Sequence, residues 1–182
     1  MEYLNIAVIG ANGVGKTQFI QRAMSLPRPP GPSATTARIN VDNLPYAVTL
    51  FELDLEYFDL DPNRQIQWPR QMGGAIMPRI HGVLLLYDVM NRESIMQLPD
   101  TLNALVNSSL PAVLVATKCD NPENARQLDT EAVAAACQSC LATFKTSSIV
   151  KMLRAQKERD RDGEQPLQLI LMLRWNRQMR AL

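Results

Sequence analysis

Short apolar runs recur along the chain, each ended by glycine, proline or a polar stretch. The runs at residues 83–87 and 111–116 are continuously apolar, which is typical of strands buried on both faces of a sheet. Asn43-Leu44-Pro45 separates two partly alternating runs and predicts the turn of a hairpin. The apolar runs together predict strands over residues 4–9, 39–44, 48–53, 83–87, 111–116 and 142–144.

Apolar residues at helical spacing predict helices over residues 16–24, 92–106, 130–141 and 167–182. Pro99 interrupts the second of these, which is therefore two short helices or one kinked helix. Asp129 or Thr130 is expected to cap the third. Residues 27–36 begin with four prolines and a glycine in six positions and predict an exposed loop. Residues 151–164 alternate charges of both signs, which is typical of a solvated helix or a disordered connection.

Strands that alternate with helices predict an α/β fold with a doubly wound, mostly parallel sheet. The hairpin would add one antiparallel strand at an edge of this sheet. Ligand sites are expected where the parallel strands end, at their carboxyl ends. We expect residues 1–182 to form a single domain, because a chain of 182 residues is of ordinary domain size.

Composition indicates an ordinary globular protein, with 46% hydrophobic and 20% charged residues. The formal net charge of +1 gives no general attraction to nucleic acid or membrane. Three cysteines are too few for a disulfide framework and favour a reducing, cytoplasmic setting. Cys137 and Cys140 lack a second ligand pair, so a metal site there is disfavoured. No run is long enough to span a bilayer, and recruitment to a membrane would depend on partners.

The segment from Gly10 to Thr17 matches the phosphate-binding pattern G-x-x-x-x-G-K-[S/T], between a predicted strand and a predicted helix. Glycines let backbone N–H groups close around phosphates above a positive helix N-terminus. Lys16 would reach the β- and γ-phosphates, and the Thr17 hydroxyl would ligate Mg²⁺. The nucleotide-binding candidates in this loop are Gly10, Asn12, Gly13, Val14, Gly15, Lys16 and Thr17.

A second motif, Thr117-Lys118-Cys119-Asp120, follows the predicted strand at residues 111–116 and indicates which base is bound. The Asp120 carboxylate can accept two parallel hydrogen bonds from N1–H and N2–H of guanine. Adenine has no such donors, so it would leave Asp120 desolvated and unpaired, at a cost of roughly 1–3 kcal/mol. The Lys118 stem can lie along the purine plane. Thr117, Lys118 and Asp120 are therefore candidate guanine-binding residues.

With both motifs in this order, the chain resembles the Ras-like small GTPases over nearly its whole length. Asp88-Val89 and the Asn-Arg-Glu-Ser stretch at residues 91–94 extend the likeness. The resemblance implies the small G-protein form of the P-loop NTPase fold, with GTP or GDP as ligand and Mg²⁺ as cofactor. It further implies base contacts from Ser147 and Ser148, and metal contacts from Thr17, from Thr35 or Thr36 as the switch threonine, and from Asp54 through water.

The chain departs from this family at the second switch. A glycine and a water-orienting glutamine should follow Asp54, but Leu55-Glu56-Tyr57-Phe58 stands there instead. Phe58 occupies the position of the glutamine. The family's aromatic residue against the base is also missing from the proline-rich loop, where Arg28 is the candidate to stack on the guanine in its place. These departures predict weak or absent intrinsic GTP hydrolysis.

Two functions remain open from the sequence. One is a guanine-nucleotide-binding molecular switch, a GTPase with a very slow intrinsic rate. The other is a catalytically dead GTP-binding module that acts as a protein-interaction scaffold. In both cases effectors or regulators would bind through residues 28–41 and 54–74, and nucleic acid would not be a partner. An ATP-dependent P-loop enzyme is disfavoured because it leaves residues 117–120 unexplained.

Overall fold

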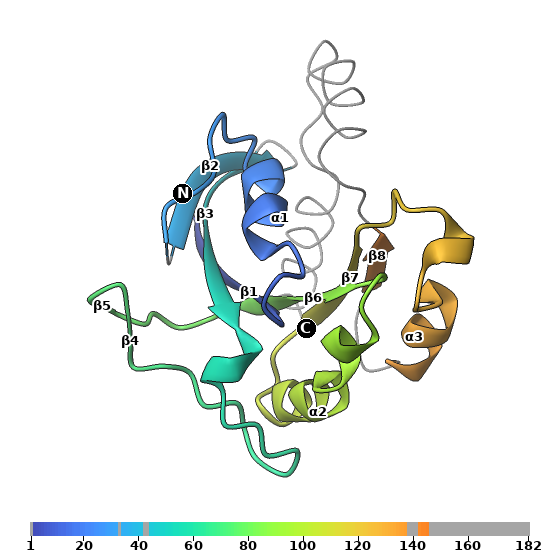
Figure 1. Ribbon diagram of the computed structural model, residues 1–182. Coiled ribbons are helices and arrows are strands. Elements are labelled where there is room, and N and C mark those ends of the chain that lie inside the picture. Colours follow the sequence, from blue (N-terminus) through green and yellow to red (C-terminus); the bar gives the residue numbers. More distant parts are fainter. Residues whose placement is uncertain (1, 33, 42–43, 138–141, 146–182) are drawn as a thin grey trace.

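A central sheet of six strands organises the molecule, and the computed structural model describes residues 2–32, 34–41, 44–137 and 142–145 (Figure 1). The strand order is β2-β3-β1-β6-β7-β8, and every neighbouring pair is parallel except β2 with β3. The doubly wound, mostly parallel sheet with one antiparallel edge strand is thereby confirmed. The strands are β1 (Glu2–Gly10), β2 (Ala34–Val41), β3 (Leu44–Asp54), β6 (Gly82–Asp88), β7 (Ala112–Thr117) and β8 (Ala142–Lys145).

Helices cover both faces of this sheet, as Figure 1 shows. The helix α1 (Lys16–Ala23) packs its buried residues on one face, together with alternate side chains of β1 and β3. On the other face lie α2 (Leu98–Asn107) and α3 (Thr130–Ala136), with the remaining alternate side chains of the sheet. Because side chains alternate along a strand, each parallel strand serves two separate cores.

The connection between the two strands of the edge hairpin is shorter than the sequence predicts. Pairing of β2 with β3 runs from Ala34 opposite Phe51 to Val41 opposite Leu44. Leu44 and Pro45 therefore belong to β3, and the prediction that they form the turn is wrong. Pro45 is tolerated because pairing of β3 with β1 starts only at the next residue. The prediction that the exposed loop extends to residue 36 is also wrong, since β2 begins at Ala34.

Pro99 separates two helices rather than kinking one. A short 3₁₀ helix, η2 (Arg92–Ile95), precedes α2, and Pro99 lies in the first turn of α2. Proline is accepted there because the first N–H groups of a helix have no partner within the helix. Asp129 caps α3 by accepting a hydrogen bond from the Glu131 N–H. A further 3₁₀ helix, η3 (Glu123–Ala125), precedes α3.

A small hairpin that the sequence analysis did not predict follows β3. The chain forms η1 (Leu55–Tyr57) and later pairs β4 (Gln71–Met72) with β5 (Ala75–Ile76). Gly73 and Gly74 both have positive φ, at 56° and 82°, as a two-residue turn of the primed type requires. The paired glycines were therefore the signal for this turn.

The predicted helix at 130–141 ends at Ala136 in the described part of the chain, with Cys137 as its cap. Burial raises the pKa of the Cys137 thiol, which packs in the core with α3. The expectation that Cys137 and Cys140 hold no metal stays a prediction. Cys140 and the segments predicted at 151–164 and 167–182 lie outside the described residues. Within those residues no helix is long and apolar enough to cross a bilayer.

Candidate functional site

The phosphate-binding pattern forms the turn between β1 and α1. Gly15 immediately precedes the helix in a left-handed conformation, with φ at 96°, and Gly13 has φ at 77°. Both conformations suit glycine and disfavour residues with a Cβ atom. No side chain caps the N-terminus of α1. The loop therefore presents backbone N–H groups and the positive end of a helix dipole, a suitable environment for phosphate.

Gly10 is required for a different reason, which is close packing. A Cβ atom at this position would lie 2.7 Å from the carbonyl oxygen of Leu86 and 2.8 Å from Cγ2 of Val14. These neighbours belong to the adjacent strand and to the loop itself, so neither moves without disturbing the sheet edge. The first glycine of the motif thus sets how closely β1 and β6 approach beneath the loop.

Gly10→Ala should lower the free energy of unfolding by about 1–3 kcal/mol, because the added methyl group overpacks this contact. Thermal or urea denaturation measures the change. Gly31→Ala is the matched control, since a Cβ atom there meets nothing within 4 Å. Equal stability of the two variants would show that the sheet edge yields more easily than the contacts indicate.

Lys16 is held by three oxygen atoms although its side chain is almost fully buried. Its Nζ donates to the carbonyl oxygens of Gly10 at 3.0 Å and Ala11 at 2.8 Å. It also pairs with Oδ1 of Asp54 at 2.5 Å. The ammonium group is therefore fixed at the mouth of the phosphate loop, where a bound phosphate would be its further partner.

The end of β3 supplies two carboxylates to the phosphate loop. Asp54 contacts Lys16, and Glu52 Oε1 accepts a hydrogen bond from the Thr17 hydroxyl at 2.6 Å. The contact made by Glu52 was not predicted from the sequence. Thr17, Glu52, Asp54, Pro30 and Tyr57 are among the residues that line a cleft of about 610 Å³ beside the loop.

The second motif lies at the end of β7 and is tied directly to the phosphate loop. The Thr117 hydroxyl donates a hydrogen bond to the Val14 carbonyl oxygen at 2.7 Å. It also lies 2.9 Å from the Tyr87 carbonyl oxygen. Lys118 follows with φ at 59°, a conformation uncommon for a residue other than glycine and often found at functional sites. Its Nζ pairs with Oδ2 of the buried Asp88 at 2.5 Å.

An arginine that the sequence analysis missed braces this second loop. The Arg126 guanidinium donates to the carbonyl oxygens of Cys119 at 2.8 Å and Asn121 at 3.0 Å. The Asn121 side chain in turn donates to the Lys118 carbonyl oxygen at 2.9 Å. Asp120 lies within this braced segment. Its backbone is thereby fixed in position before any ligand arrives.

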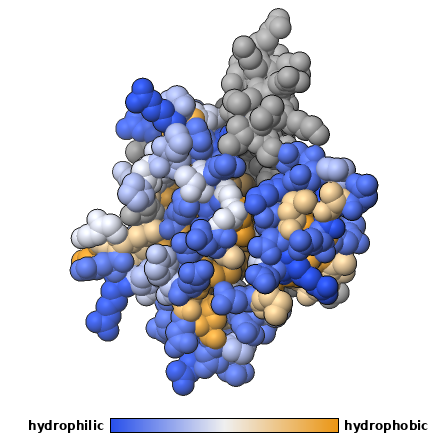
Figure 2. Space-filling view, viewed as in Figure 1, coloured by the Kyte–Doolittle hydropathy of each residue, from blue (hydrophilic) through white to orange (hydrophobic). Residues whose placement is uncertain are grey.

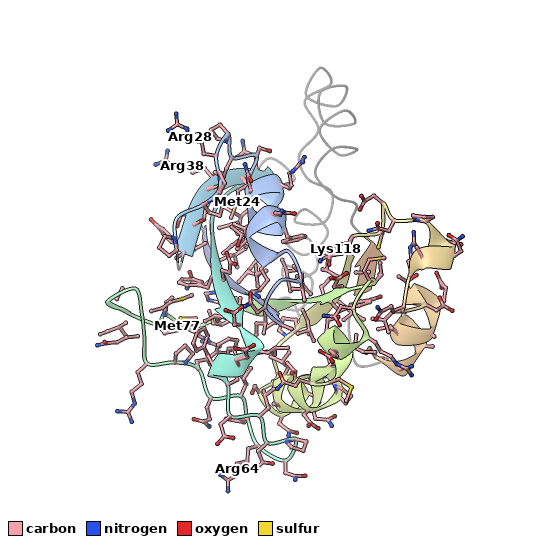
Figure 3. The ribbon with its side chains drawn as sticks, viewed as in Figure 1. Met24, Arg28, Arg38, Arg64, Met77 and Lys118 are labelled. Atoms are coloured by element: carbon pink, nitrogen blue, oxygen red, sulfur yellow. The ribbon has the colours of Figure 1, made fainter. Side chains whose placement is uncertain are left out.

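Several other predicted site residues are not brought to these loops. Thr35 and Thr36 lie within β2, where Thr36 contacts the Thr49 hydroxyl at 2.8 Å, and their role as metal ligands remains a prediction. In Figure 3, Arg28 points outward near Arg38, with α1 between it and Lys118. Stacking of Arg28 on a base therefore also stays a prediction. The predicted base contacts of Ser147 and Ser148 lie outside the described residues.

Phe58 is buried in the core and does not face the phosphate loop. Its side chain is 8% exposed and packs edge-on against Trp68, with ring centroids 5.6 Å apart. The neighbouring Tyr57 is instead 72% exposed and lines the cleft beside Thr17. The position at which a water-orienting glutamine was expected is thus occupied by a side chain of the hydrophobic core.

A glycine-rich loop with the phosphate-binding pattern and a braced loop after β7, both at the carboxyl ends of parallel strands, are features of a P-loop nucleotide-binding protein. The Ras family model matches residues 5–157, and the chain belongs to the Ras family. It is a small-GTPase-like protein whose site takes a guanine nucleotide.

The donor set beside Thr17 fits the Mg²⁺ that this family typically uses. A hydroxyl and two carboxylates offer only oxygen ligands, which Mg²⁺ prefers. In the described part of the chain, no group of three or more His, Cys, Asp or Glu side chains is placed to hold a metal.

Proposed function

We propose that this protein is a guanine-nucleotide-dependent switch that binds Mg²⁺ with GTP or GDP and hydrolyses GTP very slowly. The observation that carries the proposal is the hydrogen bond from Thr117 to the Val14 carbonyl oxygen. It ties the loop after β7 to the loop of the phosphate-binding pattern, although the two bonded residues are 103 positions apart in the chain. This proximity supports a single site in which one loop holds the base and the other the phosphates.

The roles of the residues follow from their placement. The N-terminus of α1 and Lys16 would hold the phosphates, and Thr17 and Asp54 would face the Mg²⁺. When bound, Mg²⁺ would neutralise phosphate charge. Asp120 would select guanine through its carboxylate, while Arg126 keeps the loop around it in position. The stem of Lys118 would lie along the purine, and the pairing of its Nζ with Asp88 fixes the far end of the side chain.

The direct test is to purify the protein, denature it and identify any released nucleotide by chromatography. GDP or GTP is expected. Release of ATP or ADP, or equal competition by ATP and GTP for the refilled site, would contradict the guanine assignment.

Asp120→Asn should change the preferred base from guanine to xanthine. The amide donates a hydrogen bond where xanthine carries a 2-oxo acceptor, whereas guanine presents a donor there. We expect the ratio of GDP to XDP affinity to fall at least tenfold, about 1.4 kcal/mol, in competition with a labelled nucleotide. An unchanged ratio, with the protein still folded, would remove Asp120 from the base site.

A second candidate, a GTP-binding module that serves as a docking scaffold, is favoured by the burial of Phe58. Without a water-orienting side chain, bound GTP would persist and act as a structural ligand. Partners would bind through residues 28–41 and 54–74, near the exposed Tyr57. Ile76 on β5 is 81% exposed. The surface in Figure 2 is mainly hydrophilic and carries a small apolar spot at its left margin, on the side where Figure 1 shows β4 and β5 in the same view. Quantitative recovery of GTP after long incubation would favour the scaffold over the switch.

A further inference from the structure

Glu52 occupies a position where the sheet otherwise presents apolar side chains to α1. Val48 and Leu50 precede it at intervals of two, so they share its face of β3, and both are fully buried in the core beneath α1. Asp54 continues the same row. The register sets Glu52 opposite Val8 and Asp54 opposite Gly10, at the start of the phosphate loop. A carboxylate in this row requires a polar partner, and it has one in Thr17.

The direction of that hydrogen bond matters for metal binding. A threonine hydroxyl has one proton and two lone pairs, and a carboxylate can only accept. In the 2.6 Å contact with Glu52, the Thr17 proton therefore points toward β3. The Thr17 lone pairs remain free to face a cation, and the negative partner makes the oxygen a stronger donor to that cation. Carboxylates behind a metal ligand commonly act in this way.

The balance of charge favours the same role. Among Lys16, Thr17, Glu52 and Asp54 there are one positive and two negative charges, before any phosphate is added. Glu52 and Asp54 would repel a nucleotide that arrived without a cation. The same two carboxylates would attract a dication placed between them and the phosphates.

We propose that Glu52 is a positioning residue of the magnesium site, which orients Thr17 and makes retention of the nucleotide unusually dependent on Mg²⁺. This inference rests on the proposed function, since it requires a nucleotide at the phosphate loop. Glu52 acts through Thr17 and through its charge. Asp54 does not replace Glu52 in orienting Thr17, because the Asp54 carboxylate pairs with Lys16.

The experiment measures the dissociation rate of a fluorescent GDP analogue across a range of free Mg²⁺ concentrations. The wild-type protein is compared with Glu52→Gln, which removes the charge and keeps the size. The Mg²⁺ concentration that gives half-maximal slowing should rise about tenfold or more, the usual effect of losing such a partner. With the metal chelated, the variant should release nucleotide no faster than wild type, because the repulsion is gone.

Two further variants separate this role from a merely structural one. Glu52→Asp keeps the charge but is one methylene shorter. The Mg²⁺ concentration that gives half-maximal slowing of dissociation, here called the half-point, should therefore shift by less than in Glu52→Gln. Asp100→Asn removes a carboxylate from an exposed position on α2 and should leave the half-point unchanged. If Glu52→Gln does not fold, Glu52→Asp alone decides, with an expected shift of about threefold for the weakened Thr17 contact.

The outcomes distinguish this inference from the proposed function. No binding of the GDP analogue by wild type at any Mg²⁺ concentration would refute the proposed function itself. Binding by wild type with the same Mg²⁺ half-point in Glu52→Gln and Glu52→Asp would overturn the role of Glu52 alone. A uniform rise in dissociation rate at every Mg²⁺ concentration would overturn it as well, since that result indicates only structural loss.

Discussion

Replacing Lys16 by alanine should remove tight nucleotide binding, with an expected loss of at least thirtyfold, about 2 kcal/mol. The ammonium group is fixed by two loop carbonyl oxygens and by Asp54, so it needs little rearrangement to meet a phosphate. Its removal also leaves the Asp54 carboxylate uncompensated beside the phosphates, which adds repulsion to the lost attraction. Equilibrium titration with a labelled GDP analogue in Mg²⁺ measures the effect.

A loss of nucleotide affinity must be distinguished from a loss of stability, because Lys16 also pairs with Asp54 in the folded protein. The double variant Lys16→Ala/Asp54→Asn removes both charges. We expect it to recover stability lost in the single variant but to bind nucleotide well below wild-type affinity, because the attraction between Lys16 and the phosphates is still missing. Wild-type affinity in Lys16→Ala would show that the loop is not the phosphate site.

Thr17→Ala offers a contrast within the same loop. It should weaken binding at least tenfold, about 1.4 kcal/mol, when Mg²⁺ is present, and much less when the metal is chelated. Lys16→Ala should weaken binding in both conditions. A Thr17→Ala defect that did not depend on the metal would contradict the assignment of this hydroxyl to Mg²⁺.

Phe58→Gln should destabilise the protein by about 3 kcal/mol and leave its GTP hydrolysis as slow as in wild type. The sequence alone predicts at most a modest gain in hydrolysis from a glutamine here, because the glycine of the family pattern is also absent. The structure instead places Phe58 in the core against Trp68, so the amide would be buried away from the phosphate loop. Hydrolysis needs a water held in line with the γ-phosphate, and an inward-pointing side chain cannot hold it.

Single-turnover hydrolysis of γ-labelled GTP and thermal denaturation measure the two parts of this prediction. Tyr57→Gln is the control for stability, because Tyr57 is exposed and its replacement should change unfolding by no more than about 0.5 kcal/mol. The wild-type rate should be very slow. A wild-type rate as fast as that of common Ras proteins would show that another residue positions the water. A faster rate in Phe58→Gln would show that the segment after Asp54 rearranges when GTP binds.

The predicted slow hydrolysis and the proposed role of Glu52 both arise from residues that follow Leu50. Glu52 places a carboxylate beside Thr17, while Phe58 is buried in the core where the family pattern has a polar side chain. The first feature would affect how the nucleotide is held, and the second would affect how it is hydrolysed. Both fit a protein that retains GTP for long periods as long as Mg²⁺ is present.

The sequence by itself determined the buried parallel strands and the positions of the two candidate ligand loops. The strands were predictable because both faces of a parallel strand are buried, which leaves continuous apolar runs such as residues 83–87. The loop at residues 10–17 was predictable because its glycines and Lys16 act through local backbone geometry. The motif Thr117 to Asp120 begins at the last residue of β7. In each case contiguous residues carry the information.

Only the tertiary structure decided which distant side chains meet. The bond between Thr17 and Glu52 spans 35 positions and depends on how α1 sits over β3. The burial of Phe58 depends on how the chain leaves η1, since Tyr57 ends the 3₁₀ helix and is exposed, whereas Phe58 follows it in an extended conformation and is buried. Arg126 reaches back to Cys119 around a short turn. For Glu52 the strand register decides the contact, because a shift of one residue along β3 would move its side chain to the other face of the sheet.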